Sequence, residues 1–362
     1  IVNLQVARHC QAACLLVTDI DRGGAFAHLY GTWALLAPDD RALIQGFVLN
    51  KFRGDASLLA PAPQALQDLT GIPTVATLPM WRTHGLPEED GFFEHRRSRH
   101  TAPVRLTVAV VAYPRISNLD EFQPLENLPG VRLQWVRHAA ELAELRDTDW
   151  IILPGSKATS ADLLWLRQQG LDAAVVRHAQ QGGAVLGICG GLQMLGEALI
   201  DPDSIDGNAP GLGLLPLVTR FEADKTVRHT QTCFDPATGQ STAALPVGLP
   251  ASPWTALADV AVSGYEIHQG QTQQHPAMAQ SGDVARAVLP QGLGWQSPDG
   301  RVLGIYLHGL FEDAAALQAL LAAHSPERLP TLDGVFDGLA DFIEAHFDDG
   351  VLPSLIADSP GH

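Results

Sequence analysis

The feature that most constrains the fold of this chain is a series of short, continuous apolar runs, each followed by a stretch with helical character. CLLVT at residues 14–18 and AVLGI at 184–188 are typical of the series. Apolar runs without polar alternation indicate strands buried on both faces, which belong to parallel sheets covered by helices. The sequence therefore predicts an α/β fold of βαβ units. We expect further strands at residues 46–50, 74–78, 105–112, 131–136, 150–153 and 302–307, and helices at 25–37, 58–69, 163–169, 173–181, 313–323 and 335–346.

One polar, basic segment interrupts this series, GFFEHRRSRHTAP at residues 91–103. Such a break predicts a connection between domains, and 362 residues are enough for two. Residues 207–292 are rich in Thr, Gln, Gly and Pro, so we expect strands and long loops there. The predicted organisation is a first domain, a linker, a second domain and a C-terminal helix with a tail, at residues 1–95, 96–103, 104–325 and 326–362.

Charge and composition exclude several classes of protein. The formal net charge of -17 makes nucleic acid a poor partner, although small phosphate sites are built locally and stay possible. No apolar run approaches about 18 residues and no basic segment precedes an apolar one, which predicts neither a membrane span nor a signal peptide. The four cysteines lack zinc-site spacing, so we expect no tightly bound metal and a reducing cytoplasm. They are Cys10, Cys14, Cys189 and Cys233.

The segment AVLGICGGLQML, at residues 184–195, predicts a reactive cysteine. A buried strand runs into Cys189, glycines flank it, and a helix follows, as in a nucleophile elbow with cysteine in place of serine. The glycines would permit the sharp turn, and the helix N-terminus favours the thiolate. The alternative is a structural cysteine buried in a tight turn.

Two further segments supply what a thiolate nucleophile needs. The strand at 302–307 delivers His308 to the carboxyl edge of the sheet, where Cys189 also lies, so His308 is the candidate base. The turn Pro154-Gly155-Ser156 follows another strand, and the N–H groups of Gly155 and Gly190 are candidate oxyanion donors. The alternatives are a capping or core histidine and an ordinary strand-to-helix turn.

Together these motifs resemble the class I glutamine amidotransferase domain, which implies a flavodoxin-like fold. The order PGS turn, GICGG elbow and strand-ending histidine is that of the family. In its common members a glutamate follows two residues after the histidine, but here that position is Leu310. The chain is similar instead to the cobyric acid synthase and cobyrinic acid diamide synthase branch, which implies a Cys–His dyad. We assign no third acid, not even the nearby Glu312.

The stretch GYEIHQG, at residues 264–270, also resembles that branch. The resemblance makes Tyr265, Glu266 and His268 candidate supporting residues. His268 would line the glutaminase site or support His308, and a purely structural part is an equal alternative.

The first predicted domain carries a second polar cluster. Asp19, Asp21 and Arg22 follow the strand at 14–18, and carboxylates there could hold Mg²⁺ beside ATP phosphates that Arg22 pairs with. Asn50 and Lys51 end the next strand, where an amide could read a nucleobase edge. The alternatives are a charged turn with a helix cap and a polar strand end.

DIDRGG-x-F-x-x-x-x-GT at 19–32 and GFVLNKFRGD at 46–55 resemble the cobyric acid synthase family, and the resemblance covers essentially the whole chain. It implies a partial ATP-dependent domain of the dethiobiotin synthetase type, fused to the glutaminase. No GxxxxGK[ST] motif occurs, so we expect the phosphate loop to precede residue 1 and the ATP site to be incomplete here. The implied substrates are glutamine, ATP and a corrinoid, adenosylcobyrinic acid a,c-diamide, amidated at its b, d, e and g carboxylates.

Three alternatives remain at this point. Cobyrinic acid a,c-diamide synthase shares the glutaminase, but the DIDRGG and NKFRGD segments disfavour it. The glutaminase of a peptidoglycan-precursor amidase lacks a fused synthetase segment. A non-catalytic scaffold on the same fold is disfavoured by the intact pair of Cys189 and His308. The oligomeric state is left open.

Overall fold

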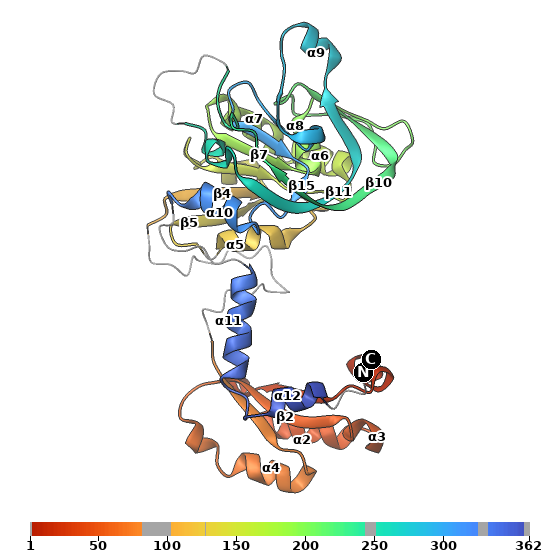
Figure 1. The fold of residues 1–362 in the computed structure, drawn as a ribbon, viewed down its shortest axis with the longest axis vertical. Helices are drawn as coiled ribbons and strands as arrows, with labels where there is room; N and C mark the ends of the chain where they lie inside the picture. Colours follow the sequence, from red (N-terminus) through yellow and green to blue (C-terminus); the bar gives the residue numbers. More distant parts are fainter. Residues whose placement is uncertain (1, 82–102, 127, 243–250, 325–331, 358–362) are drawn as a thin grey trace. The chain divides into compact units, whose positions relative to one another are not determined.

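The computed structural model describes residues 2–81, 103–126, 128–242, 251–324 and 332–357. The chain forms two compact units, Ile1–Leu86 with Asp333–His362, and Pro87–Leu332 (Figure 1). The predicted linker at 96–103 lies, apart from Pro103, outside the described residues. Among the described helices, none combines the length and the apolar character that crossing a bilayer requires.

The first unit is built on a three-stranded parallel sheet in the order β1-β2-β3. Its strands are β1 (Cys14–Asp19), β2 (Ile44–Phe52) and β3 (Thr74–Pro79). The helices are α1 (Val2–Cys10), α2 (Ala25–Leu35), α3 (Pro38–Arg41), α4 (Ala62–Thr70), α11 (Leu332–Glu344) and α12 (Val351–Ala357). Because all three strands run in one direction, their carboxyl ends share one edge, where open α/β sheets bind ligands.

Side chains on β2 alternate between two apolar layers. Phe47 and Leu49 are fully buried in the core that contains residues of α2 and α4. Val48 points the other way and packs with Val75, and Phe347 and Val351 join that second layer. The C-terminal segment, which the sequence predicts as a separate helix and tail, is thus a structural layer of the first unit.

The second unit contains a seven-stranded sheet in the order β12-β13-β14-β7-β6-β4-β5. The five strands from β14 to β5 are parallel, and β12 and β13 extend the sheet antiparallel. The strands are β4 (Leu106–Val111), β5 (Val131–Val136), β6 (Trp150–Leu153), β7 (Ala184–Ile188), β12 (Arg286–Leu289), β13 (Gly294–Gln296) and β14 (Val302–Ile305). All residues of β4, β6, β7 and β14 are buried, which confirms the α/β prediction from continuous apolar runs.

A second sheet in this unit has the order β15-β11-β10-β8-β9. Its main part is the long antiparallel pair β10–β11, green to cyan in Figure 1. The strands are β8 (Ala198–Ile200), β9 (Ala209–Pro210), β10 (Leu217–Cys233), β11 (Ala261–Gln274) and β15 (Leu307–His308). The helices of the unit are α5 (Gln123–Glu126), α6 (Thr159–Gln168), α7 (Leu171–Gln180), α8 (Gly190–Leu195), α9 (Pro276–Gln280) and α10 (Ala314–Leu321).

The strand predicted at 302–307 is in fact two strands in different sheets. β14 pairs with β7, and the chain then leaves that sheet at Tyr306, whose N–H donates to Leu293 (2.8 Å). β15 continues in the second sheet, where His308 pairs with Tyr265 of β11. His308 therefore lies at the junction of both sheets, and the prediction of one uninterrupted parallel strand was wrong because the chain changes partners.

Candidate active site

Cys189 lies between β7 and α8 in a backbone conformation that costs free energy. Its φ is 51° and its ψ is -104°, and it serves as the N-cap of α8. Its N–H donates to the carbonyl of Ile305 (2.7 Å), which fixes the turn against β14. A strained, non-glycine residue between a strand and a helix is the geometry of a nucleophile elbow. The side chain is 5% exposed.

The glycines around Cys189 provide space rather than positive φ. None of Gly187, Gly190 and Gly191 is among the described residues with positive φ. A Cβ on Gly191 would lie 1.8 Å from the carbonyl oxygen of Leu153, and one on Gly190 would lie 2.8 Å from the nitrogen of Ser156. The expectation that glycine flexibility makes the turn is therefore corrected: Cys189 itself takes the strain, and glycines let α8 approach β6.

The predicted oxyanion turn lies directly against the predicted base. A Cβ on Gly155 would meet the hydroxyl of Ser117 at 2.5 Å and Cε1 of His308 at 2.6 Å. The N–H of Ser117 donates to the carbonyl of Gly155 (2.9 Å). Within the described part of the chain, the N–H groups of Gly155 and Gly190 have no hydrogen-bond acceptor. Free N–H groups beside a nucleophile are available to an oxyanion.

His308 is buried, 3% exposed, between the thiol and a carboxylate. Its Nδ1 is 3.2 Å from Oε1 of Glu121, and the neighbouring N–H of Gly309 donates to Oε2 of Glu121 (3.1 Å). Burial lowers the pKa of His308, but hydrogen bonds to Cys189 and Glu121 outweigh it and raise that pKa to about 10. The imidazole is therefore protonated at neutral pH and places a positive charge beside the sulfur of Cys189.

Sequence reasoning missed Glu121. It belongs to a short 3-10 turn, Leu119–Phe122, which follows β4 and lies 187 positions from His308. From the sequence alone we assign no third acid, because Leu310 stands two residues after His308 and Glu312 is merely nearby. The available signal was a polar NLDE segment just past a buried strand, at the same carboxyl edge as Cys189.

A buried chain of polar side chains lies behind the elbow. Gln193 of α8 accepts from the hydroxyl of Thr159 (3.0 Å) and donates to that of Tyr306 (3.4 Å). Tyr306 in turn bonds to Thr272 of β11 (2.6 Å). A Cβ on Gly270 would lie 2.5 Å from the amide nitrogen of Gln193, so β11 needs glycine there. These hydrogen bonds connect α6, α8, Tyr306 and β11 beside Cys189.

The three candidate supporting residues separate into two faces of β11. Tyr265 is 53% exposed, whereas Glu266 and His268 are buried on the other face. Glu266 binds Arg228 through two bonds (2.7 and 3.0 Å), and His268 stacks on Tyr306 with 4.0 Å between ring centroids. Burial lowers the pKa of His268, against the bond to Gly270 and the nearby Glu266. The carboxylate that binds His308 is Glu121, whereas Nδ1 of His268 bonds to the carbonyl of Gly270 (2.9 Å).

The polar cluster predicted in the first unit is brought together at the carboxyl edge of β1 and β2. Nζ of Lys51 lies 2.9 Å from Asp19, Arg22 lies 3.7 Å from the same carboxylate, and Arg53 pairs with Asp21. The hydrogen bond from Lys51 lowers the pKa of Asp19. Asn50 is the ladder partner of Asp19, but its amide oxygen accepts the N–H of Lys51 (2.9 Å).

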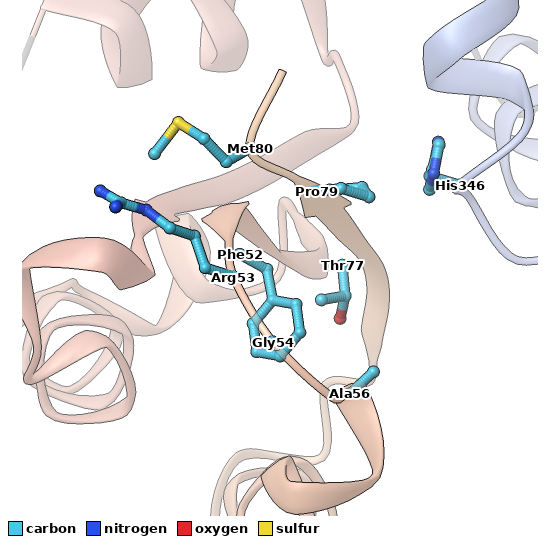
Figure 2. A pocket seen from close by; sticks show the side chains of 8 residues that line it. All are labelled: Phe52, Arg53, Gly54, Ala56, Thr77, Pro79, Met80 and His346. Carbon is cyan, nitrogen blue, oxygen red and sulfur yellow. The ribbon is translucent and has the colours of Figure 1, made fainter. Parts of the chain in front are cut away.

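A cavity of about 500 Å³ opens at the same edge, beyond the ends of β2 and β3. Figure 2 shows Arg53 and Met80 reaching to one side and His346 across from Pro79. Asn50 is not among its lining residues, which are Phe52, Arg53, Gly54, Ala56, Thr77, Pro79, Met80 and His346. No group of three or more His, Cys, Asp or Glu side chains in the described ranges is arranged to hold a metal ion.

Comparison with known proteins settles the family. A family model described as a CobB/CobQ-like glutamine amidotransferase domain matches residues 107–316. A cobyric acid synthase of Albidiferax ferrireducens is 70% identical over 98% of this chain and 69% of that protein. The chain belongs to the cobyric acid synthase family. Another member, from Polaromonas naphthalenivorans, is 66% identical over 99% of this chain and 70% of its own length.

Among solved structures, a glutamine amidotransferase matches with a TM-score of 0.40 and 17% identity, over 61% of this chain and 99% of that one. Membership of the cobyric acid synthase family confirms the resemblance on which the sequence motifs were interpreted. It makes the chain an amidotransferase of cobalamin biosynthesis and removes the non-catalytic scaffold as an alternative.

Proposed function

We propose that this enzyme hydrolyses glutamine at Cys189 and uses the ammonia, together with ATP, to amidate side-chain carboxylates of a corrinoid. The acceptor that the family resemblance implies is adenosylcobyrinic acid a,c-diamide, at its b, d, e and g carboxylates. The observation that carries the glutaminase half is the strained, buried Cys189 beside an imidazole that is held in place from its other nitrogen.

Glutamine hydrolysis follows from the protonation state of this pair. The thiolate of Cys189 attacks the carboxamide carbon, and His308 gives its proton to the leaving nitrogen, which departs as ammonia. A glutamyl thioester remains. His308 then takes a proton from water, the water oxygen attacks the thioester carbon, and glutamate leaves as the thiolate is restored. One glutamine and one water thus give one glutamate and one ammonia.

The oxyanion of each tetrahedral intermediate is assigned to the N–H groups of Gly155 and Gly190. Support comes from the lack of a competing acceptor in the described residues and from the packing of the turn against the elbow. Donors that are already in place in a buried site stabilise the developing negative charge without having to reorient. Loss of one such donor typically lowers kcat by about 10²- to 10³-fold.

ATP is assigned to the first unit, at the carboxyl edge of its parallel sheet. Lys51, Arg22 and Arg53 supply positive charge for phosphates, and Asp19 and Asp21 are oxygen ligands of the kind that Mg²⁺ takes, so the residues fit a magnesium–nucleotide group. Magnesium bound there would neutralise phosphate charge. The adjoining cavity of about 500 Å³ is of a size that suits the nucleobase. ATP activates the acceptor carboxylate for attack by ammonia.

Four free cysteines fit a reducing compartment, and we place the reaction in the cytoplasm. The partners of this enzyme are then glutamine, ATP and the corrinoid, all small molecules.

The experiment that tests the glutaminase half is steady-state release of glutamate from glutamine. We expect Cys189→Ala to lower kcat by at least about 10⁴-fold, because a nucleophile has no substitute in the site. Cys233→Ala is the matched control, since Cys233 is a free, exposed thiol at the end of β10, and it should keep wild-type turnover. Glutamate release that persists in Cys189→Ala would refute the proposed function.

A further inference from the structure

Glu121 connects the base of the proposed site to a part of the chain far from it in sequence. The carboxylate is 2% exposed, and its two oxygens accept from different donors, Nδ1 of His308 (3.2 Å) and the N–H of Gly309 (3.1 Å). Asn118, which precedes the 3-10 turn, has φ 54° and ψ 50°, a conformation that asparagine tolerates better than most residues. This turn aims Glu121 inward from the end of β4.

Burying the carboxylate of Glu121 costs free energy, which a purely structural role would have to offset. A buried carboxylate requires compensating partners, and permanent cations such as arginine are the usual ones. Among the salt bridges of the described residues, the cation that faces Glu121 is His308. By contrast, the buried carboxylate of Glu266 is paired with Arg228. The charge of Glu121 is therefore balanced by the base itself.

The segment that carries Glu121 also holds the oxyanion turn. Residues 115–117 form an antiparallel bridge with that turn, in which Lys157 donates to Arg115 (2.8 Å) and Ser117 donates to Gly155 (2.9 Å). Four residues further on, Glu121 reaches His308. One stretch of chain after β4 thus fixes both the base and the oxyanion donor relative to each other.

We propose that Glu121 is the positioning acid of this glutaminase: its carboxylate accepts the Nδ1–H of His308 and holds Nε2 toward the sulfur of Cys189. The inference rests on the proposed function of that pair. The Cys–His pair then becomes a triad whose acid lies in the 3-10 turn that follows β4. Leu310, two residues after His308, is instead buried in the core. A carboxylate in this role fixes the imidazole and stabilises its protonated form.

The charged groups around His308 define what a pH profile would report. Cys189 and Glu121 face the ring directly. Tyr113 is buried within electrostatic reach of both and of Asp162. Glu121 is one of the two groups that raise the pKa of His308 to about 10. Loss of its charge should therefore move the alkaline limb of kcat/KM to lower pH.

The test is Glu121→Gln, with glutamate release measured against pH. We expect kcat to fall by about 10²-fold with little change in KM, and the alkaline limb of kcat/KM to move to lower pH than in the wild type, where the pKa of His308 is raised to about 10. Asp120→Asn is the matched control, because Asp120 is exposed, lies in the same turn and loses the same charge. Glu121→Asp keeps the charge but shortens the side chain, so it should lower kcat without moving the alkaline limb as far.

A second readout does not depend on turnover. We expect iodoacetamide to alkylate Cys189 more slowly at pH 7 in Glu121→Gln, because an imidazole without its carboxylate partner is held less firmly beside the sulfur and activates it less. Rates are followed by mass spectrometry of the Cys189 peptide, since Cys10, Cys14 and Cys233 are also free.

Wild-type kcat, pH profile and alkylation rate in a folded Glu121→Gln would overturn the inference and leave the proposed function intact, provided Cys189→Ala is inactive. If Glu121→Gln does not fold, the same measurements on Glu121→Asp test the inference. A folded Glu121→Asp that matches the wild type in turnover and alkylation would assign Glu121 to structure alone and overturn the inference.

Discussion

The two polar clusters of this enzyme lie at comparable places in their sheets but differ in burial. Cys189, His308 and Glu121 are each 5% exposed or less, in the interior of the second unit. In the first unit the side chains of Asp19 and Lys51 are 27% and 49% exposed. Both clusters occur where parallel strands end, because carboxyl edges gather the loops of an α/β sheet.

The difference in burial indicates how each cluster is completed. The buried cluster is completed within the second unit: Glu121 binds His308, the thiol of Cys189 donates to the carbonyl of Ile267 (3.4 Å), and the surrounding core holds the backbone strain at Cys189. In the exposed cluster, lysine and arginine side chains form ion pairs with carboxylates that water can reach, and such pairs contribute little to stability. A charged ligand can replace one partner of such a pair at a small cost in free energy. Substitutions should therefore have much larger effects in the buried cluster of the second unit than in the exposed cluster of the first.

The largest effect on stability should come from Gly191→Ala. The added methyl would lie 1.8 Å from the carbonyl oxygen of Leu153, so α8 must move away from β6. We expect the second unit to lose about 3 kcal/mol or more of unfolding free energy, at the upper end for overpacking. Urea denaturation, with hydrogen exchange to identify the affected unit, measures this loss.

Gly31→Ala in α2 is the matched control in the first unit. A methyl there meets nothing within 4 Å, and Gly31 does not have a positive φ. Removal of a helix-interior glycine should stabilise by about 0.5–1 kcal/mol. Equal effects of the two substitutions would mean that the elbow is not the tightly packed region that the comparison assumes.

A smaller effect, on activity alone, is expected for Gly155→Ala. The methyl would press on Cε1 of His308 at 2.6 Å and on Ser117 at 2.5 Å, and a displacement of the base by a fraction of an ångström follows. We expect kcat for glutamine hydrolysis to fall by about 10²-fold while the melting temperature changes little. Unaltered kcat would show that the turn yields without moving the base.

The sequence predicted the architecture well because buried parallel strands have a strong local signature. The continuous runs at 150–153 and 184–188 became β6 and β7 with the same bounds. The strand–turn–helix geometry at Cys189 was predictable for the same reason, since its strand, its glycines and its helix are contiguous. The predicted residues Asp19 and Lys51 were also brought together, because neighbouring parallel strands end side by side.

Features that depend on tertiary partners were missed. The break at Tyr306 depends on which sheet accepts the next residues, and nothing in VLGIYLHG records it. Glu121 lies 187 positions from His308, which it binds, and nothing in the sequence around one acidic residue of a polar loop shows that it is buried. The role of the glycines was misread because close approach of α8 to β6 leaves no trace in the sequence beyond the glycines themselves.

The smallest effect should come from Lys51→Ala, which removes a cation of the exposed cluster. At neutral pH we expect glutamine hydrolysis within twofold of wild type and a melting temperature that is nearly unchanged, because the pair with Asp19 is partly exposed. The effect should be visible only in acid. Lys51 is the main cause of the lowered pKa of Asp19, so this carboxyl stabilises the fold above its ordinary pKa of 3.8, and the contribution is lost as pH falls through the lowered value. Melting temperatures between neutral pH and pH 3 should therefore fall less steeply in Lys51→Ala than in wild type. A large loss at neutral pH would instead mean that the first cluster, like the second, is an integral part of its unit's packing.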